Sequence, residues 1–212
     1  MKPIPQIESV GLPPEIHADR VVGEMLRWLA AEHAGAWKRV QAAIRPAGTP
    51  KAQARLLQAI RRAGGDTVFH TLLQEGTRGR FRIYGLDWCA WDTSRQGDVG
   101  PGDPVPGRPW LCCNIFTVDG RRKRSLESRR FLYVTHHALS RLAQRCGART
   151  VEDLIAATKV LAVTYMRWVT KHNERPADGT RLEVEGICTA VLCRHENDLG
   201  NVVVVTILEA EA

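Results

Sequence analysis

The stretch RFRIYGLDWCAW, residues 80–91, decides the fold class of this 212-residue chain. Aromatic and β-branched residues are frequent in it, as they are at 67–73 and 110–118, and glycine-containing segments separate the three stretches. Such stretches are typical of β-strands joined by turns. We therefore expect three antiparallel strands in the middle of the chain.

Helical patterns precede these strands. Lys51 to Ala63 has apolar residues on one side and arginines on the other, and it is followed by Gly64-Gly65. An earlier segment carries apolar residues at helical spacing, namely Val21, Val22, Met25, Leu26 and Leu29. We expect a helical N-terminal region over residues 1–64, whose first part is either one long helix or two helices broken near Gly35.

The chain after the strands predicts two more helices and a hairpin. Thr135 is a good N-cap for a helix from about His136 to Cys146, and Thr150 for one that reaches about Trp168. Residues 181–194 and 201–208 alternate or run apolar as strands do. The expected fold is therefore α+β, with N-terminal helices followed, over residues 65–212, by a mainly antiparallel sheet with two helices packed on it.

One segment of this expected domain does not fit a regular element. Residues 92–109, DTSRQGDVGPGDPVPGRP, are rich in Gly, Pro and Asp. We expect a loop here that is longer than an ordinary hairpin connection.

Composition restricts the class of protein. Hydrophobic residues make up 44% of the chain and charged residues 25%, close to the average for globular proteins. No apolar run approaches the roughly 18 to 20 residues that cross a bilayer, and the N-terminus lacks the apolar centre of a secretory signal. We expect no membrane partner, a cytoplasmic location and six reduced cysteines.

The positive charge is concentrated in one segment. Residues 121–149 hold nine Lys and Arg against Glu127 alone, so this segment carries +8 while the whole chain carries +7. Such a concentration predicts a polyanionic partner, and we favour nucleic acid, RNA in particular. An acidic protein partner and a simple solvated face remain alternatives. The candidate nucleic-acid-binding residues are Arg121, Arg122, Lys123, Arg124, Arg129 and Arg130.

The helix expected after Thr135 carries the candidate chemistry. At helical spacing, His137, Arg141 and Arg145 span about 80° of its circumference, opposite its apolar side. A histidine, two guanidinium groups and free N–H groups at a helix N-terminus suit a phosphodiester, and a neutral histidine can act as a general base. An ordinary amphipathic surface helix is the alternative.

Three strings together suggest a family. HALSRLAQR (137–145), TVEDLIAA (150–157) and VVVVTIL (202–208) resemble the small RelE-like and barnase/colicin-like ribonucleases, over roughly residues 131–208. The resemblance implies an open antiparallel sheet on helices and metal-free cleavage of RNA through its 2′-hydroxyl. The first 130 residues have no counterpart in the minimal members of that superfamily.

The resemblance also assigns roles to four residues of this chain. His137 would abstract the 2′-hydroxyl proton, Arg141 and Arg145 would stabilise the pentavalent phosphate, and Thr206 would position a phosphate oxygen. The function it predicts is that of a metal-independent ribonuclease or toxin-like protein. A non-enzymatic nucleic-acid-binding or regulatory protein and a protein-interaction module with a basic surface are the alternatives.

The sequence favours no cofactor. Cys188, Cys193 and His195 form a C-x4-C-x-H string that lacks the second pair of a structural zinc site. No Gly-rich phosphate loop and no nucleophile elbow occurs in the chain. We therefore expect neither a metal nor a cofactor, and the sequence leaves the oligomeric state open.

Overall fold

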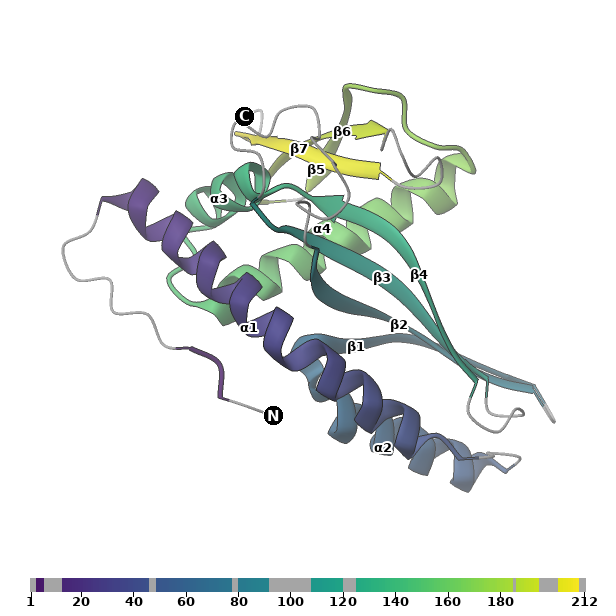
Figure 1. Ribbon diagram of the computed structural model, residues 1–212. Coiled ribbons are helices and arrows are strands. Elements are labelled where there is room, and N and C mark those ends of the chain that lie inside the picture. Colours follow the sequence, from purple (N-terminus) through teal and green to yellow (C-terminus); the bar gives the residue numbers. More distant parts are fainter. Residues whose placement is uncertain are drawn as a thin grey trace. The chain divides into compact units, whose positions relative to one another are not determined.

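The structure of the protein is a computed structural model. It describes residues 3–5, 13–45, 49–77, 80–91, 108–119, 125–184, 186–194 and 202–209. Its helices within these residues are α1 (Pro14–Ala43), α2 (Pro50–Val68), α3 (His136–Arg145) and α4 (Val151–His172) (Figure 1). Its strands are β1 (Phe69–Thr77), β2 (Arg80–Trp91), β3 (Trp110–Asp119), β4 (Ser125–Val134), β5 (Thr180–Val184), β6 (Cys188–Arg194) and β7 (Val202–Leu208).

The strands form one sheet in the order β1-β2-β3-β4-β7-β6-β5. β1 and β2, β5 and β6, and β6 and β7 pair antiparallel, whereas β4 and β7 pair parallel. The α+β class is confirmed, but the sheet is mixed and the expectation of a mainly antiparallel sheet is wrong. A parallel pair needs a long crossover between its strands, and α3, α4, β5 and β6 lie between β4 and β7 in the chain.

The chain forms two compact units. Unit 1 comprises Met1–Pro3, Leu29–Cys89 and Cys113–Arg130, and unit 2 comprises Ile4–Trp28, Ala90–Cys112 and Phe131–Ala212. Each unit thus draws on segments that are far apart in the sequence. The predicted loop at 92–109 lies, except for its last two residues, outside the described part of the chain.

The N-terminal helices follow the predicted periodicity. α1 is one helix of 30 residues that continues through Gly35, and its apolar residues Met25 and Leu29 are fully buried. In α2 the backbone leaves helical geometry at Gly65, with φ 69° and ψ 138°. Glycine tolerates this positive φ, so the predicted end at Gly64-Gly65 is found as a kink, after which the helix continues to Val68.

Local capping fixes the two helices of unit 2. The Thr135 hydroxyl accepts a hydrogen bond from the Ala138 N–H at 3.1 Å and caps α3. Thr150 and Asp153 form a reciprocal capping box at the start of α4. Asn173, in the left-handed conformation, ends α4. α3 packs on β7 and α4 packs on β5, and Figure 1 shows α3 next to the yellow strand β7.

Buried apolar side chains fill each unit. In unit 1, Ile83, Trp88 and Phe116 are fully buried. In unit 2, the buried residues include Leu139 of α3 and Leu161 of α4, together with the strand residues Leu132, Leu192 and Val204. Among the described residues, no helix has the length and hydropathy needed to span a membrane.

Candidate functional site

The predicted amphipathic character of α3 is confirmed. Leu139 and Leu142 are fully buried, whereas His137 is half-buried and Arg141 and Arg145 are exposed. The cap at Thr135 places His137 in the first turn of the helix. The exposed side of α3 therefore presents an imidazole and two guanidinium groups to its surroundings.

A hollow of about 340 Å³ lies against this side of α3, within unit 2. Its walls come from the start of α1 and from α3, and they consist of Glu15, Ile16, Asp19, His137, Ser140, Arg141 and Gln144. His137 and Arg141 are one helical turn apart, so both side chains can reach one bound group. The sequence alone did not indicate that α1 would form the opposite wall.

Asp19 organises one wall of this hollow. Its carboxylate accepts a hydrogen bond from the Ser140 hydroxyl. It also lies 4.0 Å from His136 Nε2 and 3.6 Å from Arg108 Nη1. Together with Glu15, Asp19 offsets the positive charge that Arg141 brings to the hollow. The hollow is therefore polar, with acidic and basic groups on facing walls.

One of the N–H groups that were expected to be free at the start of α3, that of Ala138, is already bonded. Thr135 is fully buried and His136 is only 7% exposed. The Thr135 hydroxyl already accepts the Ala138 N–H. The side chains of His137 and Arg141 are the basic groups that line the hollow and that a bound anion would meet.

The other two residues predicted to be catalytic lie outside the lining of this hollow. Arg145 forms an ion pair with the carboxylate of Glu209. Thr206 is half-buried on β7, where it pairs with Val191 of β6. The hollow thus brings together two of the four predicted residues, His137 and Arg141.

The basic segment is described only in part. Residues 121–124 lie outside the described residues. Arg129 and Arg130 are exposed on β4 in unit 1. Their exposure leaves them accessible to a polyanion but does not identify one, so the prediction that they bind nucleic acid stays a prediction.

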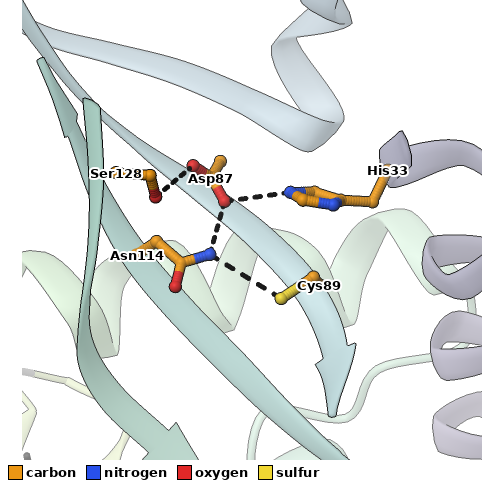
Figure 2. Close-up of polar contacts among 5 residues, drawn as sticks. All are labelled: His33, Asp87, Cys89, Asn114 and Ser128. Carbon is orange, nitrogen blue, oxygen red and sulfur yellow. Dashed lines mark hydrogen bonds and ion pairs between the residues drawn. The ribbon is translucent and has the colours of Figure 1, made fainter. Parts of the chain in front are cut away.

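A second polar cluster, in unit 1, was not predicted from the sequence (Figure 2). The side chain of Asp87 on β2 has no exposed surface, and its carboxylate accepts three hydrogen bonds. Asn114 Nδ2 donates at 2.6 Å, His33 Nε2 lies at 3.1 Å and Ser128 Oγ donates at 3.3 Å. Asn114 Nδ2 also contacts Cys89 Sγ at 3.7 Å.

The buried carboxylate of this cluster changes the pKa of His33. Desolvation by burial lowers the pKa of His33, but the hydrogen bond to the Asp87 carboxylate and the negative charge of that carboxylate raise the pKa, and the net result is a pKa above the usual 6.5. A raised pKa favours the imidazolium, which pairs with the buried carboxylate. Because the side chain of Asp87 is completely buried, this cluster ties α1 to strands β2, β3 and β4 rather than forming an open reaction site.

A sequence signal for this cluster did exist. Asp87 stands between Leu86 and Trp88 in a stretch that is otherwise mostly aromatic and aliphatic. A carboxylate at such a position in a buried strand needs partners, because burying an unpaired charge costs several kcal/mol. The identity of those partners could not be read from the sequence, since His33 is 54 residues away.

All six cysteines lie in the described residues, and none of them forms a disulfide. Burial strongly raises the pKa of the Cys113 thiol and raises that of Cys188 to about 11. In the part of the chain that the structure describes, no three His, Cys, Asp or Glu side chains are placed to hold a metal ion.

Comparison with known proteins adds no relative to this description. No protein-family model, curated protein or solved structure matches the chain.

Proposed function

We propose that the protein is a metal-independent RNA-cleaving protein, of the ribonuclease or toxin-like kind, and that the hollow beside α3 is its reaction site. The observation that supports this most directly is that His137 and Arg141 line the same hollow, one helical turn apart. A base and a guanidinium at this spacing can serve one phosphodiester: the base takes a proton, and the cation compensates the charge that develops on phosphorus oxygens.

The proposed step is an intramolecular displacement. Neutral His137 accepts the proton of the ribose 2′-hydroxyl, and the 2′-oxygen forms a bond to phosphorus. The bond from phosphorus to the 5′-oxygen breaks, and the leaving oxygen takes a proton from water. The hydroxide that remains then takes the proton held by His137, which restores the base. The products are a 2′,3′-cyclic phosphate and a 5′-hydroxyl end. Arg141 stabilises the pentavalent phosphate.

Neighbouring residues modify this step. The hydrogen bond from Ser140 to Asp19 fixes the wall next to His137. Arg145 can join Arg141 at the phosphate only when its ion pair with Glu209 opens. Thr206 lies outside the hollow lining, so its proposed role would need substrate contacts beyond this hollow.

RNA binding forms part of the same proposal. Glu15 and Asp19 reduce the attraction of the hollow itself for an anion. Binding to RNA would therefore depend on cations elsewhere, and Arg129 and Arg130 are exposed candidates from the basic segment. A formal net charge of +7 also favours encounter with a polyanion at low salt.

The test is cleavage of total RNA and of labelled DNA in excess EDTA. We expect the wild type to cleave RNA and to leave DNA intact. We expect His137→Ala to cleave RNA about 10²- to 10⁴-fold more slowly, as is usual on removal of a general base. Arg141→Ala should also slow cleavage, because the proposed transition state loses its guanidinium. Arg27→Ala is the matched control for it, because Arg27 is an exposed cation of unit 2 that pairs with Glu24. Circular dichroism of each variant checks that it is folded.

The outcomes separate the alternative functions. Cleavage that persists unchanged in His137→Ala would remove the proposed mechanism. RNA that stays intact but bound would indicate a non-enzymatic nucleic-acid-binding or regulatory protein. RNA that neither binds nor is cut would leave the protein-interaction module with an acidic partner as the remaining proposal.

A further inference from the structure

A second hollow in unit 2, away from the lining residues of the α3 hollow, has the composition of a binding groove. It has a volume of about 430 Å³ and lies between α4 and the edge strand β5. Its walls are Thr164, Arg167, Trp168, Lys171, Arg181, Leu182, Glu183 and Thr189. Volumes of this order are typical of small-ligand sites.

The α4 wall is a single helical stripe. Thr164, Arg167, Trp168 and Lys171 follow one another at spacings of three, one and three residues, so they lie along one side of the helix. Arg167 and Lys171 are exposed, and Thr164 and Trp168 are half-buried. The stripe therefore offers two cations, an indole and a hydroxyl to whatever occupies the groove.

The strand wall adds a third cation. Arg181 and Glu183 of β5 are exposed, and Thr189 of β6 pairs with Glu183 in the sheet. The lining carries a formal charge of +2, because it contains the three cations Arg167, Lys171 and Arg181 and the one carboxylate of Glu183. Unlike the α3 hollow, whose two carboxylates offset its arginine, this groove favours an anion.

Trp168 distinguishes the groove from a merely basic surface. Its indole stacks on the imidazole of His172, with ring centroids 4.5 Å apart and planes inclined by 27°. This stacking holds the indole in a defined orientation beside Arg167 and Lys171. A fixed aromatic plane beside cations is the arrangement that binds an unpaired base and its phosphates.

We propose that the groove between α4 and β5 binds a segment of single-stranded nucleic acid, with a base stacked on Trp168 and the adjoining phosphates on Arg167, Lys171 and Arg181. Bases paired in a duplex could not reach the indole, so the ligand is single-stranded. This inference takes its ligand class from the proposed function, but it needs no cleavage. The site serves to hold a strand.

The test uses a strand that cannot be cleaved through a 2′-hydroxyl. A fluorescein-labelled DNA oligonucleotide of ten thymidines is titrated with the full chain, and binding is followed by fluorescence anisotropy at several salt concentrations. We expect the double variant Arg167→Ala/Lys171→Ala to bind about tenfold more weakly at low salt. The slope of log K against log salt should fall by about 0.7 for each cation removed.

The indole is tested separately. Trp168→Leu should weaken binding about fivefold or more with little change in the salt slope, whereas Trp168→Phe should retain most of the affinity because it keeps an aromatic face. Arg27→Ala, which removes an exposed cation of the same unit outside the groove, is the control and should bind as the wild type does. Both charge substitutions are at exposed positions, so the double variant should fold.

Three results would overturn the inference. The first is equal affinity of the wild type and the double variant. The second is displacement of the strand by thymidine monophosphate when the concentration of the monophosphate equals the concentration of nucleotides in the bound strand. This result would assign the groove to a free nucleotide. The third is binding of polyglutamate that depends on Arg167 and Lys171 while Trp168→Leu has no effect, which would assign it to an acidic protein.

These results are independent of the proposed cleavage. Loss of RNA cleavage in His137→Ala with DNA binding unchanged would support both proposals. Intact RNA in every assay, together with groove-dependent DNA binding, would refute the nuclease and keep the groove.

Discussion

Removal of the Asp87 carboxylate is the sharpest test of the buried cluster in unit 1. Asp87→Ala takes the shared acceptor away from Asn114, His33 and Ser128 at once. Because the Asp87 side chain has no exposed surface, water cannot simply replace the lost carboxylate. The substitution should therefore destabilise the folded protein far more than removal of a surface carboxylate.

The magnitude can be worked out donor by donor. Asn114 is 7% exposed, and leaving its buried amide without this acceptor costs about 1–3 kcal/mol. His33 loses a charge-assisted hydrogen bond, worth about 1.5–3 kcal/mol. Ser128 is exposed, and its hydroxyl can donate to water instead, so losing its hydrogen bond to Asp87 costs about 0 kcal/mol. The expected decrease in the free energy of unfolding is therefore about 2.5–6 kcal/mol, a range that includes the cost of about 3–5 kcal/mol usual for breaking a buried charge pair.

The assay is urea unfolding followed by circular dichroism at pH 6, where His33 is charged. Glu127→Ala is the matched control, because Glu127 is an exposed carboxylate on β4 of the same unit, and its removal should change the free energy of unfolding by less than about 0.5 kcal/mol. A decrease below about 1 kcal/mol for Asp87→Ala would refute the reasoning, since it would mean that the carboxylate does not satisfy these donors.

Three further predictions concern other parts of the molecule. The folded-state pKa of His33 is raised above 6.5, so the stability that His33 contributes is fully present below pH 6.5 and is lost as the pH rises through the folded-state pKa. The difference in free energy of unfolding between the wild type and His33→Gln should therefore shrink between pH 6 and pH 9. A difference that stays constant would contradict the pairing of His33 with Asp87. Thr150→Ala removes the capping box of α4 and should cost about 1 kcal/mol in urea unfolding, whereas an unchanged midpoint would show that the cap contributes nothing. Burial raises the pKa of Cys188 to about 11, so its thiol should react with Ellman's reagent at pH 8 far more slowly in the folded protein than in urea; equal rates would show that the thiol is accessible.

Interactions close together in the sequence were the most predictable. The caps of α3 and α4 each depend on a threonine and the residues just after it, so Thr135 and Thr150 could be identified from the sequence. The buried and exposed sides of α3 followed from helical spacing alone, because a regular helix fixes where each side chain points. The run VVVVTIL was likewise recognisable as a strand.

The candidate site was only half predictable. His137 and Arg141 were chosen from the pattern on one helix, and they do line a common hollow. The partners of that helix come from elsewhere: Asp19, which bonds Ser140, is 121 residues away in the sequence. The ion pair between Arg145 and Glu209 spans 64 residues and could not be expected from the helix pattern.

Tertiary structure alone decided the sheet and the buried cluster. The alternation of residues along a strand predicts which side chains lie on each face of the sheet, but it does not predict which strand lies beside it. The parallel pairing of β4 with β7 therefore had no signal in the sequence of either strand. The position of Asp87 in an apolar stretch required buried partners, yet only folding brought His33 and Asn114 to it. The sequence determined most of the elements, with their caps and apolar faces, because these depend on local backbone geometry, but it did not indicate that β4 begins at Ser125. Which faces and charges meet was decided by the packing of segments far apart in the chain, where each buried polar group must find a partner.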